Sequence, residues 1–253
     1  MVASRLNALL NACLPVLFAA LVFGFAWEAA VAFGEVPQYV LPSPTGIIAA
    51  AVQRFPQLAD GLWLTTFEAL SGFAVGAAIG LALACLFLLM PPLEALLLPL
   101  VVALNTVPSI AFVPLALLWF GMGPASKIAI AALAVSFAVL LAALEGFTRT
   151  EDGQVNLLRS FGAGRLAILW RLRLPAAMPS IVTGLRIGLA RSTIAVIVAE
   201  MLGAYKGIGQ IVYRGTAEMD SLTVWAAILL SSAVSLALYG LLVQIDRRLV
   251  WWQ

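Results

Sequence analysis

The sequence contains no histidine, and charged side chains make up only 10% of its 253 residues. Without histidine, the chain lacks the commonest metal ligand and the commonest general base near neutral pH. A soluble domain carries roughly 25% charged residues, so this chain cannot cover a surface that faces water. Its two cysteines, Cys13 and Cys85, lie in apolar runs and are interpreted as packing residues, not as a disulfide. These shortages argue against a metal site, a nucleic-acid partner and an embedded enzyme with clustered nucleophiles.

Apolar sequence takes the place of charge, because hydrophobic residues make up 63% of the chain and the mean hydropathy is +1.07. A membrane-spanning helix requires about 20 mostly apolar residues. Only helices or closed barrels satisfy every backbone group in lipid, and no alternation typical of barrel strands is found. The sequence therefore predicts an all-α, polytopic transmembrane bundle in one domain, residues 1–253. Six spans are expected, at 12–33, 62–89, 94–119, 126–147, 180–203 and 222–245.

The first apolar run allows two interpretations. Arg5 precedes it, as a basic residue precedes the apolar region of a cleaved signal peptide. The run is long, however, and it lacks a small-x-small exit. These features favour a helix that is retained.

Basic residues are distributed unevenly between the predicted loops, which sets the expected orientation. Six spans place both termini and the 148–179 loop on one side, together with Arg5, Arg149, Arg159, Arg165, Arg171, Arg173, Arg247 and Arg248. The other side holds Arg54, Lys127, Lys206 and Arg214. The side with more basic residues is expected to be cytoplasmic, so both termini are predicted to lie in the cytoplasm.

Glycine and proline indicate how the helices pack. A spacing of four residues recurs among the glycines of two predicted spans, namely Gly72, Gly76, Gly80, Gly184 and Gly188. Glycine ridges let helix backbones approach closely in lipid. The ridges could serve packing within one subunit or an interface between subunits. Pro108 and Pro114 in the third span each remove a backbone hydrogen bond and favour a kink.

The 148–179 loop carries the most information of any loop. It is predicted to form a helix, a break at 162–164 and a second amphipathic stretch that ends at Pro175. Thr148 and Glu151 are spaced as a capping box. The apolar face of the first helix consists of Leu157, Leu158 and Phe161. The loop could lie on the membrane surface, with arginines outward, or it could dock a soluble partner.

Two segments of this loop, 158–163 (LRSFGA) and 174–179 (LPAAMP), resemble the EAA loop of type I ABC importer permeases. Further segments are similar to the nitrate, sulfonate and taurine branch, which includes thiamine-precursor and riboflavin permeases. They are 41–44 (LPSP), 114–121 (PLALLWFG), 183–188 (TGLRIG), 199–203 (AEMLG) and 207–209 (GIG). The resemblance covers residues 37–250 and implies a MetI-like fold. One departure is Asn156-Leu157-Leu158 at the usual Glu-Ala-Ala.

The resemblance implies the membrane-spanning subunit of a bacterial inner-membrane importer. Two permease copies, or this chain with a sibling, would form the pathway within the lipid bilayer. Two cytoplasmic ATPase subunits would bind ATP and Mg, and a binding protein outside would deliver the substrate. The chain itself has no Gly-x-x-x-x-Gly-Lys-Ser/Thr motif, so neither a cofactor nor ATPase activity of its own is expected. Contact with the ATPase is expected from Asn156, Leu157, Leu158, Arg159, Phe161, Gly162, Ala163 and Pro175.

The substrate remains open within this branch, whose members carry nitrate, sulfonates, taurine, thiamine precursors or riboflavin. The resemblance implies a small solute, either anionic or similar to a vitamin precursor. An alternative is a channel or secondary transporter that works without an ATPase. Such proteins usually show inverted repeats, and no internal repeat is found here.

Charges and a proline inside the predicted spans are candidates for the translocation pathway. The candidates are Glu68, Pro114, Arg186, Arg191 and Glu200. Arginine at the bilayer centre costs about 2.5–3.5 kcal/mol or more, so Arg191 needs water, an anion or a carboxylate partner. Two hypotheses follow: Arg191 pairs with Glu68, or it contacts an anionic substrate. Glu200 could form an outer gate or a dock for the binding protein, or it could be a capping carboxylate.

Overall fold

The computed structural model describes residues 2–34 and 36–249, which are almost entirely helical and include no strand. This confirms the all-α prediction. In chain order the elements are α1 (Val2–Phe33), α2 (Pro44–Gln53), α3 (Phe55–Leu89), α4 (Pro91–Thr106), η1 (Ser109–Phe112), α5 (Val113–Phe120), α6 (Pro124–Thr148), α7 (Asp152–Ser160), α8 (Arg165–Ile168), η2 (Leu169–Arg173), α9 (Leu174–Gly203), α10 (Ile208–Ala217) and α11 (Ser221–Leu249).

Four helical stretches are each long and apolar enough to cross a membrane without interruption. They are Phe55–Leu89, Pro124–Thr148, Arg165–Gly203 and Ser221–Asp246. They correspond to the second, fourth, fifth and sixth predicted spans. α1 covers the first predicted span, and its stretch Phe18–Phe33 is apolar. The described residues thus contain four such spans, or five if α4 and the bent segment Ser109–Phe120 form one, whereas the sequence predicted six.

The third predicted span is broken, which corrects the expectation of one kinked helix. α4 ends at Thr106, and the following segment turns away from it by 91°. Pro108 explains the break, because a proline forces the preceding residue out of the helical region. Val107 is accordingly extended, with φ −79° and ψ 124°. Pro114, expected to add a second kink, instead lies in the first turn of α5, where a missing N–H costs nothing.

The centre of the molecule is a tightly packed group of three helices, α3, α6 and α9. A Cβ added to Gly76 would lie 2.7 Å from Val135 on α6, and one added to Gly80 would lie 3.1 Å from Val139. Gly184 on α9 is similarly close to Ala138 and neighbouring residues of α6. The glycine ridges therefore serve packing within the chain, the first of the two interpretations.

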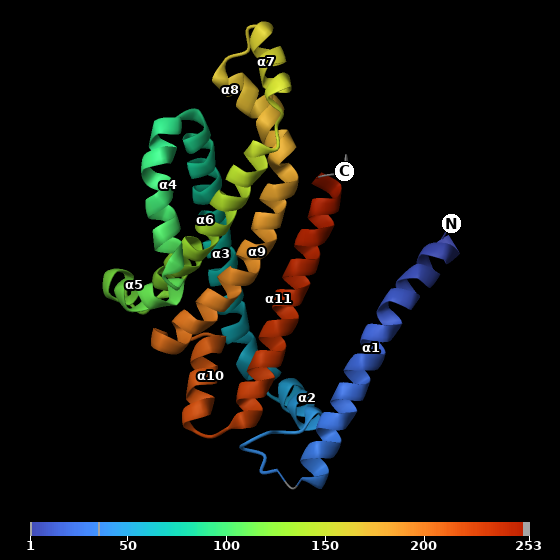
Figure 1. Ribbon diagram of the computed structural model, residues 1–253. Coiled ribbons are helices and arrows are strands. Elements are labelled where there is room, and N and C mark those ends of the chain that lie inside the picture. The colour runs from blue at the N-terminus through green and yellow to red at the C-terminus, as the bar shows by residue number, and fades with distance from the viewer. Residues whose placement is uncertain (1, 35, 250–253) are drawn as a thin grey trace.

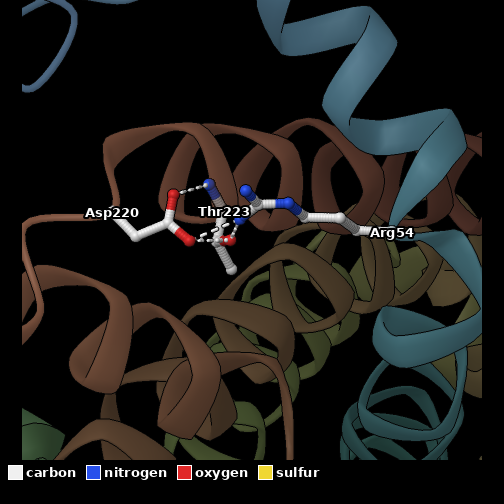
Figure 2. A network of polar contacts seen from close by, with 3 residues as sticks. All are labelled: Arg54, Asp220 and Thr223. Carbon is white, nitrogen blue, oxygen red and sulfur yellow. Dashed lines mark hydrogen bonds and ion pairs between the residues drawn. The ribbon is translucent and has the colours of Figure 1, made fainter.

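A second layer joins α2, α10 and the adjacent end of α11. Its apolar core includes Leu58, Ile208 and Ala226. Arg54, between α2 and α3, donates to both Asp220 and Thr223 at the start of α11, as Figure 2 shows. Thr223 also donates to Asp220 through its hydroxyl, at 2.6 Å, and through its N–H, at 3.2 Å. This network fixes the α2–α3 junction to the α10–α11 junction.

α1 stands apart from the central helices along most of its length (Figure 1). Near its C-terminal end, Trp27 meets Trp225 of α11 edge to face, with ring centroids 5.2 Å apart. Glu28 accepts from the Thr45 hydroxyl at 2.7 Å and from the Thr45 N–H at 3.1 Å. The far ends of α1 and α11 lie toward the same end of the molecule as α7 and α8, whereas α2, α5 and α10 lie toward the other (Figure 1).

Candidate functional site

The 148–179 loop forms a helix, a turn and a second helix at one tip of the molecule (Figure 1). α7 begins at Asp152 without a side-chain cap, and the Thr148 hydroxyl donates to the Glu145 carbonyl instead. The expected capping box is therefore wrong. Thr148 is the last residue of α6, whereas Glu151 precedes α7, so the two residues do not cap the same helix.

Gly162 forms the turn with φ +82°, in the left-handed region that glycine adopts without strain. Its N–H donates to the Arg159 carbonyl, and the N–H of Ala163 donates to the Leu158 carbonyl at 3.0 Å. These bonds close the C-terminal end of α7 in the way helices commonly end at a left-handed residue. The break expected at 162–164 is thus placed as the sequence predicts.

Large apolar side chains of this loop point outward. Leu157 is 58% exposed and Phe161 is 79% exposed. Asn156, Arg159, Gly162 and Pro175 are also exposed, whereas Leu158 and Ala163 are half-buried. Val155, 3% exposed, anchors α7 against the rest of the chain. The structure therefore presents most of the predicted contact residues on an outer surface that no part of residues 2–34 and 36–249 covers.

Pro175 does not end the second helix, contrary to expectation. The helical path runs without a break from Arg165 to Gly203, through one π-helical turn, η2. Pro175 follows directly in the first turn of α9. A π turn widens the helix locally and often marks a functional position. Here it comes just before Pro175, whose missing N–H would otherwise interrupt the hydrogen-bond ladder of the helix. The loop is thereby joined rigidly to a helix of the central group.

The base of the loop also rests on the turn between α3 and α4. Arg165 donates to the Leu89 carbonyl at 3.4 Å. A cavity of about 260 Å³ lies between the two segments and is bounded by Arg159, Arg173 and Glu94 among others. A displacement of the loop would therefore be transmitted to both α9 and the α3–α4 hairpin.

At the opposite end, Glu200 is fully buried and caps α10. Its carboxylate accepts from the N–H of Gly209 at 2.7 Å and from the Thr65 hydroxyl at 2.8 Å. Thr65 in turn accepts from the N–H of Ile208 at 2.9 Å. The first two N–H groups of α10, which no helix can pair internally, are thus satisfied from α3 and α9. The geometry supports the capping alternative, and a residue with 0% exposure offers no docking surface in this conformation.

Glu68 lies in the same cluster and not beside Arg191. It is 2% exposed, and its nearest charged neighbours are Glu200 and Lys127. Lys127, 0% exposed, donates to the carbonyls of Met122 at 2.7 Å and Gly203 at 2.5 Å. The proposed Glu68–Arg191 pair is therefore wrong for this structure. Among the described residues, ion pairs occur only at Arg54–Asp220, Arg149–Glu145 and Arg186–Asp246.

Lys127 and Thr65 were missed as site residues. Lys127 was counted with the cations outside the spans, although the predicted span 126–147 includes it. That position was the available signal, because a charge inside an apolar span needs polar partners. Thr65 gave no signal, because its partners lie 135 and 143 residues away.

Two neighbouring cavities open along α4, α6 and α9. The larger, about 510 Å³, is lined by Arg186, Arg191 and Asp246 together with residues of α4 and α6. The smaller, about 280 Å³, is lined by Arg191, Pro108 and residues of η1 and α6. Arg186 pairs with Asp246 of α11. Two of the five predicted pathway residues thus line one cavity, whereas Glu68 and Glu200 are buried elsewhere and Pro114 lines neither.

Residues 75–251 match the family described as binding-protein-dependent transport system inner membrane component. A probable ABC transporter permease of Haemophilus influenzae is 33% identical over 89% of this chain and 92% of its own length. The taurine transport system permease TauC of Escherichia coli is 32% identical over 85% and 78%. The formylaminopyrimidine transport permease ThiX of Halalkalibacterium halodurans is 31% identical over 90% and 91%.

The fold is also similar to a solved one. A chain from an inward-facing structure of the MetNI methionine ABC transporter superposes with a TM-score of 0.70 and 18% identity. The match covers 78% of this chain and 98% of that chain. This likeness shows the fold alone.

Proposed function

This chain belongs to the family of binding-protein-dependent transport system inner membrane components, and from that premise we infer how its parts serve transport. The chain is the membrane-spanning permease subunit of an ATP-driven ABC importer. In the proposed arrangement the whole chain, residues 1–253, is one permease domain. Two copies form a solute pathway, and residues 148–179 couple each copy to an ATPase subunit that hydrolyses ATP with Mg.

The observation that carries this proposal is the exposed apolar surface of the loop. Leu157 and Phe161 stand on a short helix whose inner side is fixed by buried Val155. The second part of the loop is held by buried Ile168 and Leu169 and by the bond from Arg165 to Leu89. A helix that lies on a membrane surface would turn its apolar side toward the bilayer, but α7 lies beyond the ends of the long helices (Figure 1). A groove on a soluble partner accounts better for this surface.

The same proposal sets orientation and the remaining partners. The end with α7 and α8 faces the cytoplasm of a bacterium, and both termini lie there, as the excess of basic residues favours. The opposite end, with α2, α5 and α10, faces a binding protein that delivers substrate. The substrate is a small organic solute of the kind named for the relatives, such as taurine or formylaminopyrimidine.

Copurification tests the proposal directly. The ATPase subunit that copurifies with the wild-type chain should be lost from Phe161→Glu, because a charge placed in an apolar contact must be desolvated. Met219→Glu is the matched control, since Met219 is also apolar and 75% exposed but lies next to α10 at the other end. Equal recovery of the ATPase with both variants would contradict docking at α7.

A further inference from the structure

Arg191 and Asn105 stand at the junction of the two cavities described above. Both residues line the cavity of about 510 Å³ and the cavity of about 280 Å³. Arg191 comes from α9 and Asn105 from α4, so the two face one space from different helices. Volumes of this order are those of small-molecule sites, which are roughly 300–1,000 Å³.

The charges that line these cavities do not cancel. Five charged side chains border the larger cavity, namely Glu145, Arg149, Arg186, Arg191 and Asp246. Four of them form two pairs, Arg149 with Glu145 at 3.4 Å and Arg186 with Asp246. Arg191 forms no ion pair with any residue that the structure describes. One positive charge is therefore left over, and it belongs to the side chain that the two cavities share.

The depth of Arg191 makes that charge significant. It lies 12 residues before the end of α9, which is about 18 Å along a helix and close to the middle of a roughly 30 Å bilayer core. Its guanidinium offers five N–H donors in a planar fork. A fork of this shape matches two oxygens of a carboxylate, sulfonate or phosphate. Asn105 can add an amide donor from the facing helix.

We propose that Arg191 and Asn105 form a binding site for the oxyanion group of a small organic anion, a sulfonate or a carboxylate, on the transport pathway. This inference rests on the proposed function and specifies its substrate class. It favours solutes such as the sulfonate for which TauC is named over uncharged solutes. The paired arginines, Arg149 and Arg186, hold the wall of the cavity and leave Arg191 to the ligand.

The test measures charge selectivity inside the cavity and does not depend on transport. Ile187, 48% exposed, lines the larger cavity one helical turn from Arg191. In a full-length background with Cys13→Ala and Cys85→Ala, Ile187→Cys is reacted in membranes with an anionic and a cationic methanethiosulfonate. The anionic reagent should react faster. Arg191→Gln should lower the ratio of the two rates about tenfold, Arg191→Lys should preserve most of it, and Arg171→Gln, a cation outside both cavities, should leave it unchanged.

Protection identifies the ligand chemistry. Millimolar ethanesulfonate or propionate should slow modification of Ile187→Cys when Arg191 is present and not in Arg191→Gln, and the anion that protects better identifies the group. Uncharged propionamide should give no protection. A rate ratio that Arg191→Gln leaves unchanged, or equal protection by propionamide, would overturn the site. Loss of ATPase copurification does not alter this readout, so the coupling proposal and the anion site fail separately.

Discussion

At the scale of single residues, Glu200 joins three helices through hydrogen bonds that its position in an apolar helix does not indicate. It receives an N–H from α10 and a hydroxyl from α3 while belonging to α9. Lys127 supports the same region from α6 by binding the carbonyl of Gly203. Four helices therefore meet around a few buried polar atoms, and each of those atoms is expensive to leave unpaired in an apolar interior.

Replacing Glu200 with alanine should destabilise the protein by about 1–3 kcal/mol, because the buried N–H of Gly209 would be left without its acceptor. Glu200→Gln should cost less, since the amide oxygen can still accept that bond. The midpoint of thermal unfolding in detergent measures both. Glu218→Ala, at an exposed residue directly after α10, is the control. If Glu218→Ala lowered the midpoint as much as Glu200→Ala does, the capping role would be refuted.

Gly207 should tolerate no side chain. Its φ is +120°, and a Cβ there would fall on the Glu200 carboxylate. Gly207→Ala should therefore lower the unfolding midpoint at least as much as Glu200→Ala. Gly207→Ala should lower the unfolding midpoint less in a Glu200→Ala background than in the wild type, because the carboxylate with which its Cβ clashes is absent there. Strictly additive effects would show that the two residues do not interact.

Sequence reasoning found the charged residues of the spans but not their partners. The spacing along α9 sets Glu200 apart from Arg186 and Arg191, yet nothing in it shows that α10 folds back to place Gly209 at the Glu200 carboxylate. The hypothesis that Glu68 pairs with Arg191 rested on two opposite charges inside predicted spans. The sequence does not give the rotation of each helix about its axis, and in the structure Glu68 lies near Lys127 whereas Arg191 lines the cavities.

At the scale of elements, the contact of α3 with α6 depends on the absence of side chains at three positions. Gly76→Val should prevent the close approach, since its Cβ alone would lie 2.7 Å from Val135. Overpacking of this kind costs about 1–3 kcal/mol or more. Gly24→Val on α1 is the matched control, because no atom lies within 4 Å of a Cβ there. Size-exclusion profiles and unfolding midpoints should separate the two variants clearly.

The network at the α10–α11 junction should make stability depend on pH in a defined direction. Burial acts to raise the pKa of Asp220, but hydrogen bonds from Thr223 and Arg54 outweigh it and hold that pKa below its usual value. A depressed pKa stabilises the folded state above the unfolded value, about 3.9, and this contribution disappears as the pH falls through the folded pKa. The partly exposed pair contributes less than about 1 kcal/mol.

Unfolding midpoints of wild type and Asp220→Asn, compared at pH 7 and pH 3, measure that contribution. At pH 7 the wild type should be slightly more stable than Asp220→Asn, and this difference in stability should shrink at pH 3. If the two proteins differ equally at both values, the carboxylate charge contributes nothing and the network acts through packing.

The sequence predicted the elements well wherever a span was continuous. The glycine ridges and the length of the apolar runs fixed α3, α6, α9 and α11 within a few residues at most boundaries. The third span failed because apolar length cannot show direction: the chain from Leu93 to Phe120 is apolar on both sides of the bend. Pro108 carried the only signal, and a proline can kink a helix or end it depending on what packs behind it.

For the whole molecule, the turn at Gly162 should decide whether ATP hydrolysis responds to substrate. Gly162→Leu forces a branched residue into φ +82°, at a cost of order 1–3 kcal/mol, and should move Phe161 out of place. Hydrolysis in proteoliposomes with the binding protein should then lose its stimulation by substrate, while the chain still inserts. Gly153→Leu lies on the same helix in open space and should keep stimulation. Normal stimulation in Gly162→Leu would rule out this turn as the coupling element.

α1 is a long helix whose side-chain contacts described above lie near its C-terminal end. Its 32 residues extend about 48 Å, and the holding contacts, Trp27 on Trp225 and Glu28 with Thr45, lie within the last seven residues. A rotation of about 10° at Trp27 would carry residue 14, about 20 Å away along the helix, through about 3 Å. A spectroscopic label near residue 14 would therefore magnify, severalfold, small shifts at the α2–α11 junction that are too slight to be measured where they arise.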